Sequence, residues 1–98
     1  MTAPVPQTVE TGVTQVKLVY LARLREVFGV SSEQFALPGG VRDVAGLLAC
    51  LRSRGGVWEK ELDAGRAFKV AVNHVMAGPA TPLDAGSEVA IFPPVTGG

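Results

Sequence analysis

The sequence predicts an α+β fold in which a mixed sheet of four to five strands carries one main helix on one face. Two observations lead to this prediction. Short apolar segments typical of strands are bounded by Gly, Pro and Asn, and a single longer segment between them has apolar residues at helical spacing. The 98 residues, of which 47% are hydrophobic, are enough for one small core. The expected order of main elements is β-β-α-β-β-β.

The first half of the chain begins with residues 1–14, which are rich in Thr and Pro and are expected to be a flexible extension. Residues 16–22 are almost continuously apolar, which is typical of a strand that is covered on both faces or central in a sheet. Residues 24–29 are expected to form a short helical turn that ends at a glycine. Residues 33–37 alternate weakly and predict a second strand, antiparallel to the first.

Residues 41–54 are predicted to be the main helix. Asp43 is placed in its first turn, where a negative charge complements the helix dipole. The glycines at 55 and 56 are expected to end it. An isolated helix of this length is marginal in water, so its apolar stripe must pack on the sheet. The stripe consists of Val41, Val44, Leu47, Leu48 and Leu51.

The second half supplies the remaining strands. Residues 58–62 are expected to be a short helical or irregular piece, with Trp58 closing one end of the core. Residues 68–72 and 75–77 predict a third and a fourth strand. The Asn73–His74 pair between them favours a tight turn, since Asn tolerates positive φ.

Residues 88–92 form the last predicted strand. It and the first strand are strongly apolar, and a helix lies between the two pairs of strands. We therefore expect the first and last strands to be parallel neighbours in the middle of the sheet. This is the β-grasp arrangement of ubiquitin-like proteins, with a domain over residues 15–92 and a C-terminal tail over residues 93–98.

The tail is the most distinctive stretch of the sequence. Two prolines cannot donate to a sheet ladder, so they lead the chain off the sheet and favour an extended conformation. The two final glycines have no Cβ and suit a passage too narrow for other residues. The tail can reach roughly 20 Å. Its residues are Pro93, Pro94, Val95, Thr96, Gly97 and Gly98. We interpret it as a device that presents the Gly98 carboxylate to the active site of another protein.

Composition excludes several classes of function. The formal net charge is zero and no basic run occurs, so neither nucleic acid nor a membrane is an expected partner. Cys50 is the only cysteine and His74 the only histidine, so no metal site and no internal disulfide are expected. No apolar run is long enough for a membrane span, and the N-terminus lacks the charge pattern of a signal peptide. A cytoplasmic location is expected.

Three stretches resemble the family of small sulfur-carrier subunits of molybdopterin synthase (MoaD/ThiS-like). They are residues 19–29 (VYLARLREVFG), 71–73 (AVN) and 83–98 (LDAGSEVAIFPPVTGG). The resemblance covers about residues 16–98. It implies that Gly98 is the covalent carrier, first as an acyl adenylate and then as a thiocarboxylate that donates sulfur to the dithiolene of the molybdenum cofactor.

The resemblance also implies the partners. An E1-like adenylyltransferase (MoeB-like) would activate Gly98 with ATP. A cysteine desulfurase or rhodanese would supply sulfur, and the large catalytic subunit of the synthase (MoaE-like) would receive the tail. No cofactor is expected to be bound permanently, and catalysis is expected to come from the partners.

Four residues are candidates for contact with a partner: Phe92, Ile91, Met76 and Arg25. Aromatic residues often anchor interfaces, and Phe92 stands where the strand leaves the sheet. The alternative is that Phe92, Ile91 and Met76 only pack in the core, and that Arg25 belongs to a weak surface charge pair.

Other functions remain open. The chain also suits a sulfur carrier for the thiamin thiazole or a tungsten-type cofactor. Two alternatives come from other functional classes. One is a protein modifier that is joined through Gly98 to a lysine of a target protein, and the other is a ubiquitin-like interaction module that needs no chemistry at Gly98.

Overall fold

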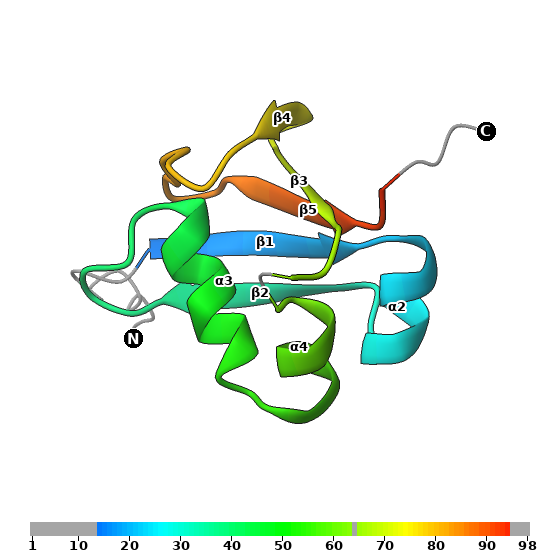
Figure 1. Ribbon diagram of the computed structural model, residues 1–98. Helices are drawn as coiled ribbons and strands as arrows, with labels where there is room; N and C mark the ends of the chain where they lie inside the picture. The colour runs from blue at the N-terminus through cyan, green and yellow to red at the C-terminus, as the bar shows by residue number, and fades with distance from the viewer. Residues whose placement is uncertain (1–13, 64, 95–98) are drawn as a thin grey trace, which may run out of the picture.

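The computed structural model describes residues 14–63 and 65–94, which form one mixed sheet with three helices (Figure 1). The strands are β1 (Thr14–Tyr20), β2 (Ser32–Leu37), β3 (Lys69–Val72), β4 (Val75–Ala77) and β5 (Glu88–Phe92). The helices are α2 (Ala22–Phe28), α3 (Val44–Arg52) and α4 (Gly56–Glu61).

The sheet has the strand order β2-β1-β5-β3-β4. The first and last strands, β1 and β5, are parallel neighbours in its centre. The pairs β1–β2, β3–β5 and β3–β4 are antiparallel. The β-grasp prediction is therefore confirmed, with five strands in the sheet.

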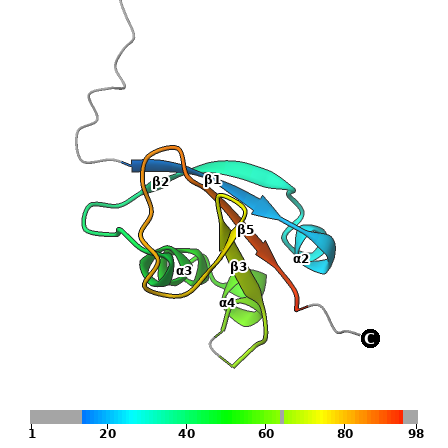
Figure 2. The ribbon, with the colours of Figure 1, turned by 90° about the horizontal axis from the view of Figure 1, so that it is seen from above.

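One face of the sheet is covered by α3 and α4, whereas α2 lies at the end of β1 (Figure 2). Alternate β1 side chains (Val16, Leu18 and Tyr20) are fully buried in the core, together with Leu47 and Leu51 of α3. The residues between them on β1 are exposed or half-buried. The expectation that the first strand is central is confirmed, but it is covered on one face only.

The junction between β1 and α2 differs from the prediction. β1 begins at Thr14, the last residue assigned to the N-terminal extension, and ends at Tyr20. Ala22, predicted to end the strand, is the first residue of α2 and has a positive φ of 53°. Continuous apolarity hid this boundary, because Leu21 and Ala22 suit a strand as well as a helix. The rest of the extension, residues 1–13, lies outside the described part.

The main helix is shorter than predicted, because α3 starts at Val44 and ends at Arg52. Asp43 precedes the first turn and caps it, since its Oδ1 accepts a hydrogen bond of 2.9 Å from the backbone N–H of Gly46. Asp43 also forms an isolated bridge with Pro82, which holds the preceding residues out of the helix. Val41 packs against the core from the loop.

The remaining predictions need only small changes. The segment around Trp58 is helical, as α4, and Trp58 packs against the core. The third strand starts at Lys69, one residue later than expected. Asn73 and His74 have φ values of 52° and 70°, which confirms the tight turn between β3 and β4. Within the described residues, no helix is long and apolar enough to cross a bilayer.

Candidate functional site at the end of the last strand

The end of β5 is held on both sides. The carbonyl oxygen of Ile91 accepts a hydrogen bond of 3.1 Å from the backbone N–H of Leu21, which connects β1 to α2. On the other side, Phe92 pairs with Lys69 of β3. Pro93 follows and has no N–H to extend the ladder. The place where the chain leaves the sheet is therefore fixed by the two strands that flank β5.

The beginning of the predicted tail is partly packed, because Pro93 and Pro94 are both half-buried. This is consistent with a defined starting direction for the residues that follow. The other tail predictions concern Val95, Thr96, Gly97 and Gly98, which lie outside the described residues.

The uncovered side of the sheet is named the open face here. Its apolar residues on β1, β3, β4 and β5 are Val19, Ala71, Met76, Ala90 and Phe92. The register lines up Met76 of β4, Ala71 of β3 and Ala90 of β5 in one row, and Val19 of β1 continues it. Phe92 stands two positions along β5 from Ala90, next to the start of the tail. Met76 and Phe92 are the largest apolar side chains of this row, and Lys17, Lys69 and Glu88 add charged side chains to the same face.

The four predicted partner contacts do not lie together. Met76 is 60% exposed and Phe92 is half-buried, both on the open face, so neither is a pure core residue. Ile91 is fully buried in the core, and its side chain is therefore inaccessible to a partner. For Ile91 the alternative of core packing holds. Arg25 is exposed on α2, the helix at the end of β1 (Figure 2).

Leu21 is an exposed apolar residue that the sequence analysis did not single out. It is 40% exposed and directly follows β1, beside the end of β5. The exposure of Leu21 had a signal in the sequence, namely the charged residue Lys17 within the apolar segment 16–22. It indicates that the odd-numbered positions of β1 point away from the core.

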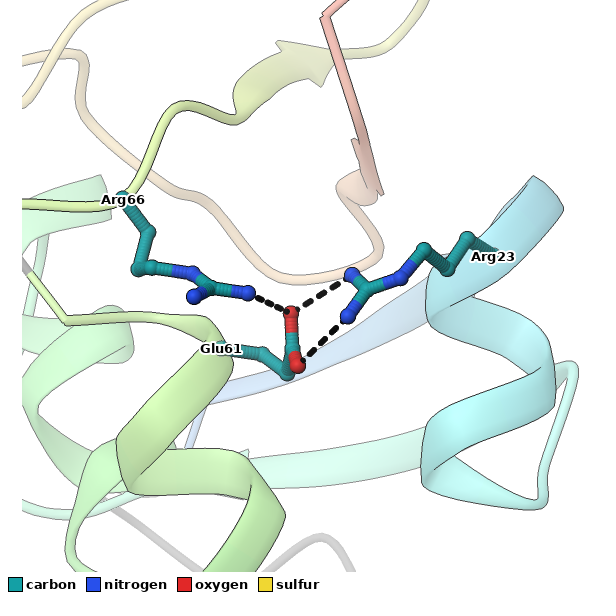
Figure 3. A network of polar contacts seen from close by, with 3 residues as sticks. All are labelled: Arg23, Glu61 and Arg66. Atoms are coloured by element: carbon teal, nitrogen blue, oxygen red, sulfur yellow. Dashed lines mark hydrogen bonds and ion pairs between the residues drawn. The ribbon is translucent and has the colours of Figure 1, made fainter.

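A second feature missed from the sequence is a cluster of charges near the same end of the sheet (Figure 3). Glu61, the last residue of α4, is only 6% exposed. Arg23 of α2 donates two hydrogen bonds to its carboxylate, at 2.7 and 2.9 Å, and Arg66 donates a third at 3.1 Å. The hydrogen bonds from Arg23 hold the pKa of the Glu61 carboxyl below its ordinary value. We name this group the Arg23–Glu61–Arg66 cluster.

Another polar cluster joins β1 and β2 to Arg54, which follows α3, on the covered face of the sheet. The buried Tyr20 hydroxyl donates a hydrogen bond of 2.7 Å to Glu33, which also accepts two from Arg54 at 2.9 and 3.0 Å. The Arg54 guanidinium lies 4.4 Å from the ring centroid of Trp58, a cation–π geometry. Burial raises the pKa of Tyr20, so its hydroxyl stays protonated and remains a donor. Hydrogen bonding from Arg54 lowers the pKa of Glu33.

Across residues 14–63 and 65–94, no three residues among His, Cys, Asp and Glu are grouped to bind a metal ion. His74 is 84% exposed, with Nε2 4.0 Å from a carboxylate oxygen of Glu88. Cys50 is half-buried on α3.

The ThiS family is matched over residues 18–98. The molybdopterin synthase sulfur carrier subunit of Escherichia coli (strain K12) is 32% identical over 83 residues, which are 85% of this chain and 99% of that protein.

Two solved structures share the fold. The Haloferax volcanii small archaeal modifier protein 1 is 27% identical with a TM-score of 0.61, and the match covers 84% of this chain and 99% of that one. A Helicobacter pylori chain, from a complex of subunits 1 and 2 of the molybdopterin-converting factor, is 23% identical with a TM-score of 0.60. That match covers 87% of this chain and 100% of the other, and at this identity it supports the fold alone.

Proposed function

This chain belongs to the ThiS family of sulfur carriers, and from that premise we propose that it is the sulfur carrier subunit of a molybdopterin synthase. The observation that carries the proposal is the last strand. It is fixed on both sides up to Phe92, leaves the sheet at two prolines and leads to Gly98. The 32% identity to a protein of that function, over nearly the whole of that protein, supports the same choice.

In the proposed reaction, Gly98 carries the sulfur and the folded domain provides the surface that docks to the partners. The Gly98 carboxylate attacks the α-phosphate of ATP in an E1-like enzyme, which releases pyrophosphate and leaves an acyl adenylate. This activation is needed because a free carboxylate is a poor acceptor for a sulfur nucleophile. The outer sulfur of a persulfide on a cysteine desulfurase or rhodanese then displaces AMP and forms an acyl disulfide. A thiol reductant cleaves its S–S bond, which forms a new disulfide on the donor and leaves the thiocarboxylate on Gly98. ATP is consumed by the activating enzyme, and the carrier itself keeps no cofactor.

The large catalytic subunit of the synthase then receives the tail. In our proposal Gly97 and Gly98 enter its active site, and the segment from Pro93 to Thr96 spans the passage leading to it. Met76 and Phe92 of the open face contact the body of the partner, together with Arg25 on α2.

The decisive experiment is a loading assay read by intact mass. The purified chain is incubated with ATP, an E1-like adenylyltransferase and a sulfur donor, and its mass should rise by about 16 Da as oxygen is replaced by sulfur. A chain lacking Gly97 and Gly98 is the matched control and should gain nothing. No gain in the full chain, with an enzyme that loads its own carrier, would contradict the proposal.

The pathway is identified by the receiving protein. Copurification with a large synthase subunit, followed by dithiolene formation from the pterin precursor, supports molybdopterin synthesis. Loading without such a partner points to another sulfur-transfer pathway, such as that of the thiamin thiazole or a tungsten-type cofactor.

A second candidate function is protein modification, favoured by the structural similarity to a small archaeal modifier protein. In this case the Gly98 carbonyl forms an isopeptide bond with a lysine of a target. Higher-mass species in which the Gly98 carbonyl is joined to a lysine of the target, absent when Gly98 is deleted, would support this function.

A further inference from the structure

We propose that Arg23 and Glu61 are positioning residues that set the direction in which the tail leaves β5. The inference rests on the proposed function, because it concerns delivery of Gly98 to a partner. It is carried by the contacts of the Arg23–Glu61–Arg66 cluster, which joins both flanks of the end of β5.

The Glu61 carboxylate is a fixed anchor. It is almost completely buried and accepts three charge-assisted hydrogen bonds, two of them from one guanidinium in a bidentate geometry. Arg23 reaches it from α2 and Arg66 from the segment before β3, from opposite sides of the carboxylate (Figure 3). A bidentate pair restrains direction as well as distance, so Arg23 has little freedom relative to α4.

One flank connects Arg23 to the end of β5 through the backbone. Arg23 is two residues after Leu21, whose N–H is bonded to the carbonyl of Ile91. Ala22 lies between them with a φ of 53°, a left-handed conformation that is unfavourable for a residue with a Cβ. Such a conformation persists only where the surrounding contacts enforce it, and such positions often occur at functional sites. The next residue, Arg23, is held by two hydrogen bonds to Glu61, which limits how Ala22 can relax.

The other flank connects Arg66 to the same strand end. Arg66 lies three residues before Lys69, which pairs with Phe92, the last residue of β5. One buried carboxylate therefore restrains the segments that lie on either side of Ile91 and Phe92. Loosening it should free the last residues of β5 with little effect on the hydrophobic core, of which none of the three charged residues is a member.

The competing explanation is an ordinary stabilising ion pair. The two explanations differ in which backbone amides respond. A general loss of stability accelerates hydrogen exchange at all amides that open by global unfolding, whereas a local effect is confined to the end of β5. Two amides that are bonded to β5 or its neighbouring residue serve as probes. The N–H of Leu21 lies at the end of β5 where the tail begins. The N–H of Lys17 is bonded to Ser87 at 2.8 Å, near the opposite end of β5.

The test uses Arg23→Met in the full chain, which removes the hydrogen bonds but keeps most of the apolar stem. Exchange at Leu21 should accelerate by about tenfold, the scale of a charge-assisted hydrogen bond, while exchange at Lys17 stays within about twofold. Arg42→Met is the matched control, because it removes the same charge from an exposed residue beside the first turn of α3. Equal acceleration at both probes, or none at Leu21, would overturn the proposal. Glu61→Gln should reproduce the result of Arg23→Met.

The functional readout is the loading reaction with the E1-like enzyme. For Arg23→Met we expect kcat to fall about three- to tenfold with KM changed by less than about twofold, because docking surfaces remain while delivery of Gly98 is misdirected. Arg23→Lys should recover part of kcat. An unchanged kcat despite faster exchange at Leu21 would contradict a role in delivery. Failure of the wild-type chain to load would instead contradict the proposed function, and the exchange result would still decide whether the cluster fixes the end of β5.

Discussion

The two faces of the sheet use the same strands in different ways. On the covered face, large side chains of β1 and β5 such as Leu18, Tyr20 and Ile91 are fully buried beneath the helices. On the open face, Ala90 of β5 alternates with Ile91 and pairs with Ala71 of β3, which lies beside Met76. Because strand residues point alternately to opposite sides, one apolar segment builds both faces. The comparison teaches that apolar residues of β1 and β5 build the core on one face, whereas those on the other face remain open to the partner contact proposed above.

The largest expected difference is in stability. Leu47→Ala on α3, where the side chain is fully buried, should lower the free energy of unfolding by about 2–5 kcal/mol. Met76→Ala on the open face should change it by less than about 0.5 kcal/mol. Urea unfolding followed by circular dichroism measures both values. Similar losses for the two variants would show that the open face belongs to the core.

The next effect should be in binding. Met76→Asp places a charge on the open face and should weaken binding to the large synthase subunit about tenfold or more, with stability nearly unchanged. Isothermal titration calorimetry gives the Kd. Val57→Asp, at a 42% exposed apolar residue of α4, is the control and should bind normally. Equal weakening by both variants would mean that the effect is one of general charge.

A smaller effect is expected at the helix that covers the core. Asp43→Ala removes the side-chain cap from the start of α3 and should lower the free energy of unfolding by about 1 kcal/mol. Asp43→Asn should lose less, since its amide oxygen can still accept from the N–H of Gly46. The urea midpoints of the three proteins check the order. An alanine variant as stable as the parent would show that the Asp43–Pro82 bridge alone fixes this helix end.

The smallest effect concerns pH and the covered face. Hydrogen bonds from Arg54 and Tyr20 lower the pKa of Glu33 in the folded state. The associated stability is therefore fully present above the ordinary pKa of glutamate, about 4.3, and is lost as pH falls through the lower folded value. The contribution of this half-buried pair should be under about 1 kcal/mol. Glu33→Gln should be less stable at pH 7 and should lose less on acidification, and parallel pH profiles of the two proteins would contradict this.

Much of the fold was predictable because local signals agree with it. The apolar stripe of α3 follows from periodicity and the turn at Asn73–His74 from turn chemistry. The parallel pairing of β1 with β5 follows from the strong apolarity of both strands and the helix between the two pairs of strands. The errors lie at boundaries where local signals compete. At Asp43 a residue that suits the first turn is used as the cap, which moved the start of the helix from Val41 to Val44.

The candidate site was only partly predictable, since its parts meet through tertiary contacts. The departure of the chain from β5 at Pro93 can be predicted from the residue type, because proline has no N–H to extend the ladder. The partner of Arg23 is not, because Glu61 is 38 positions away and nothing local to either residue indicates the pairing. Exposure of Met76 and burial of Ile91 likewise depend on which face the helices cover.

The central place of β5 has a mechanical consequence. A pull on the tail, whether by a partner dissociating or by an unfolding machine, acts along the axis of β5. The hydrogen bonds to β1 and β3 run across that axis, so the load is shared among many bonds at once and strains them in shear. The domain should therefore resist unfolding by a force on its tail far better than unfolding by a force that peels off the short outer strand β4. A carrier pulled by its tail out of a tight complex should then stay folded.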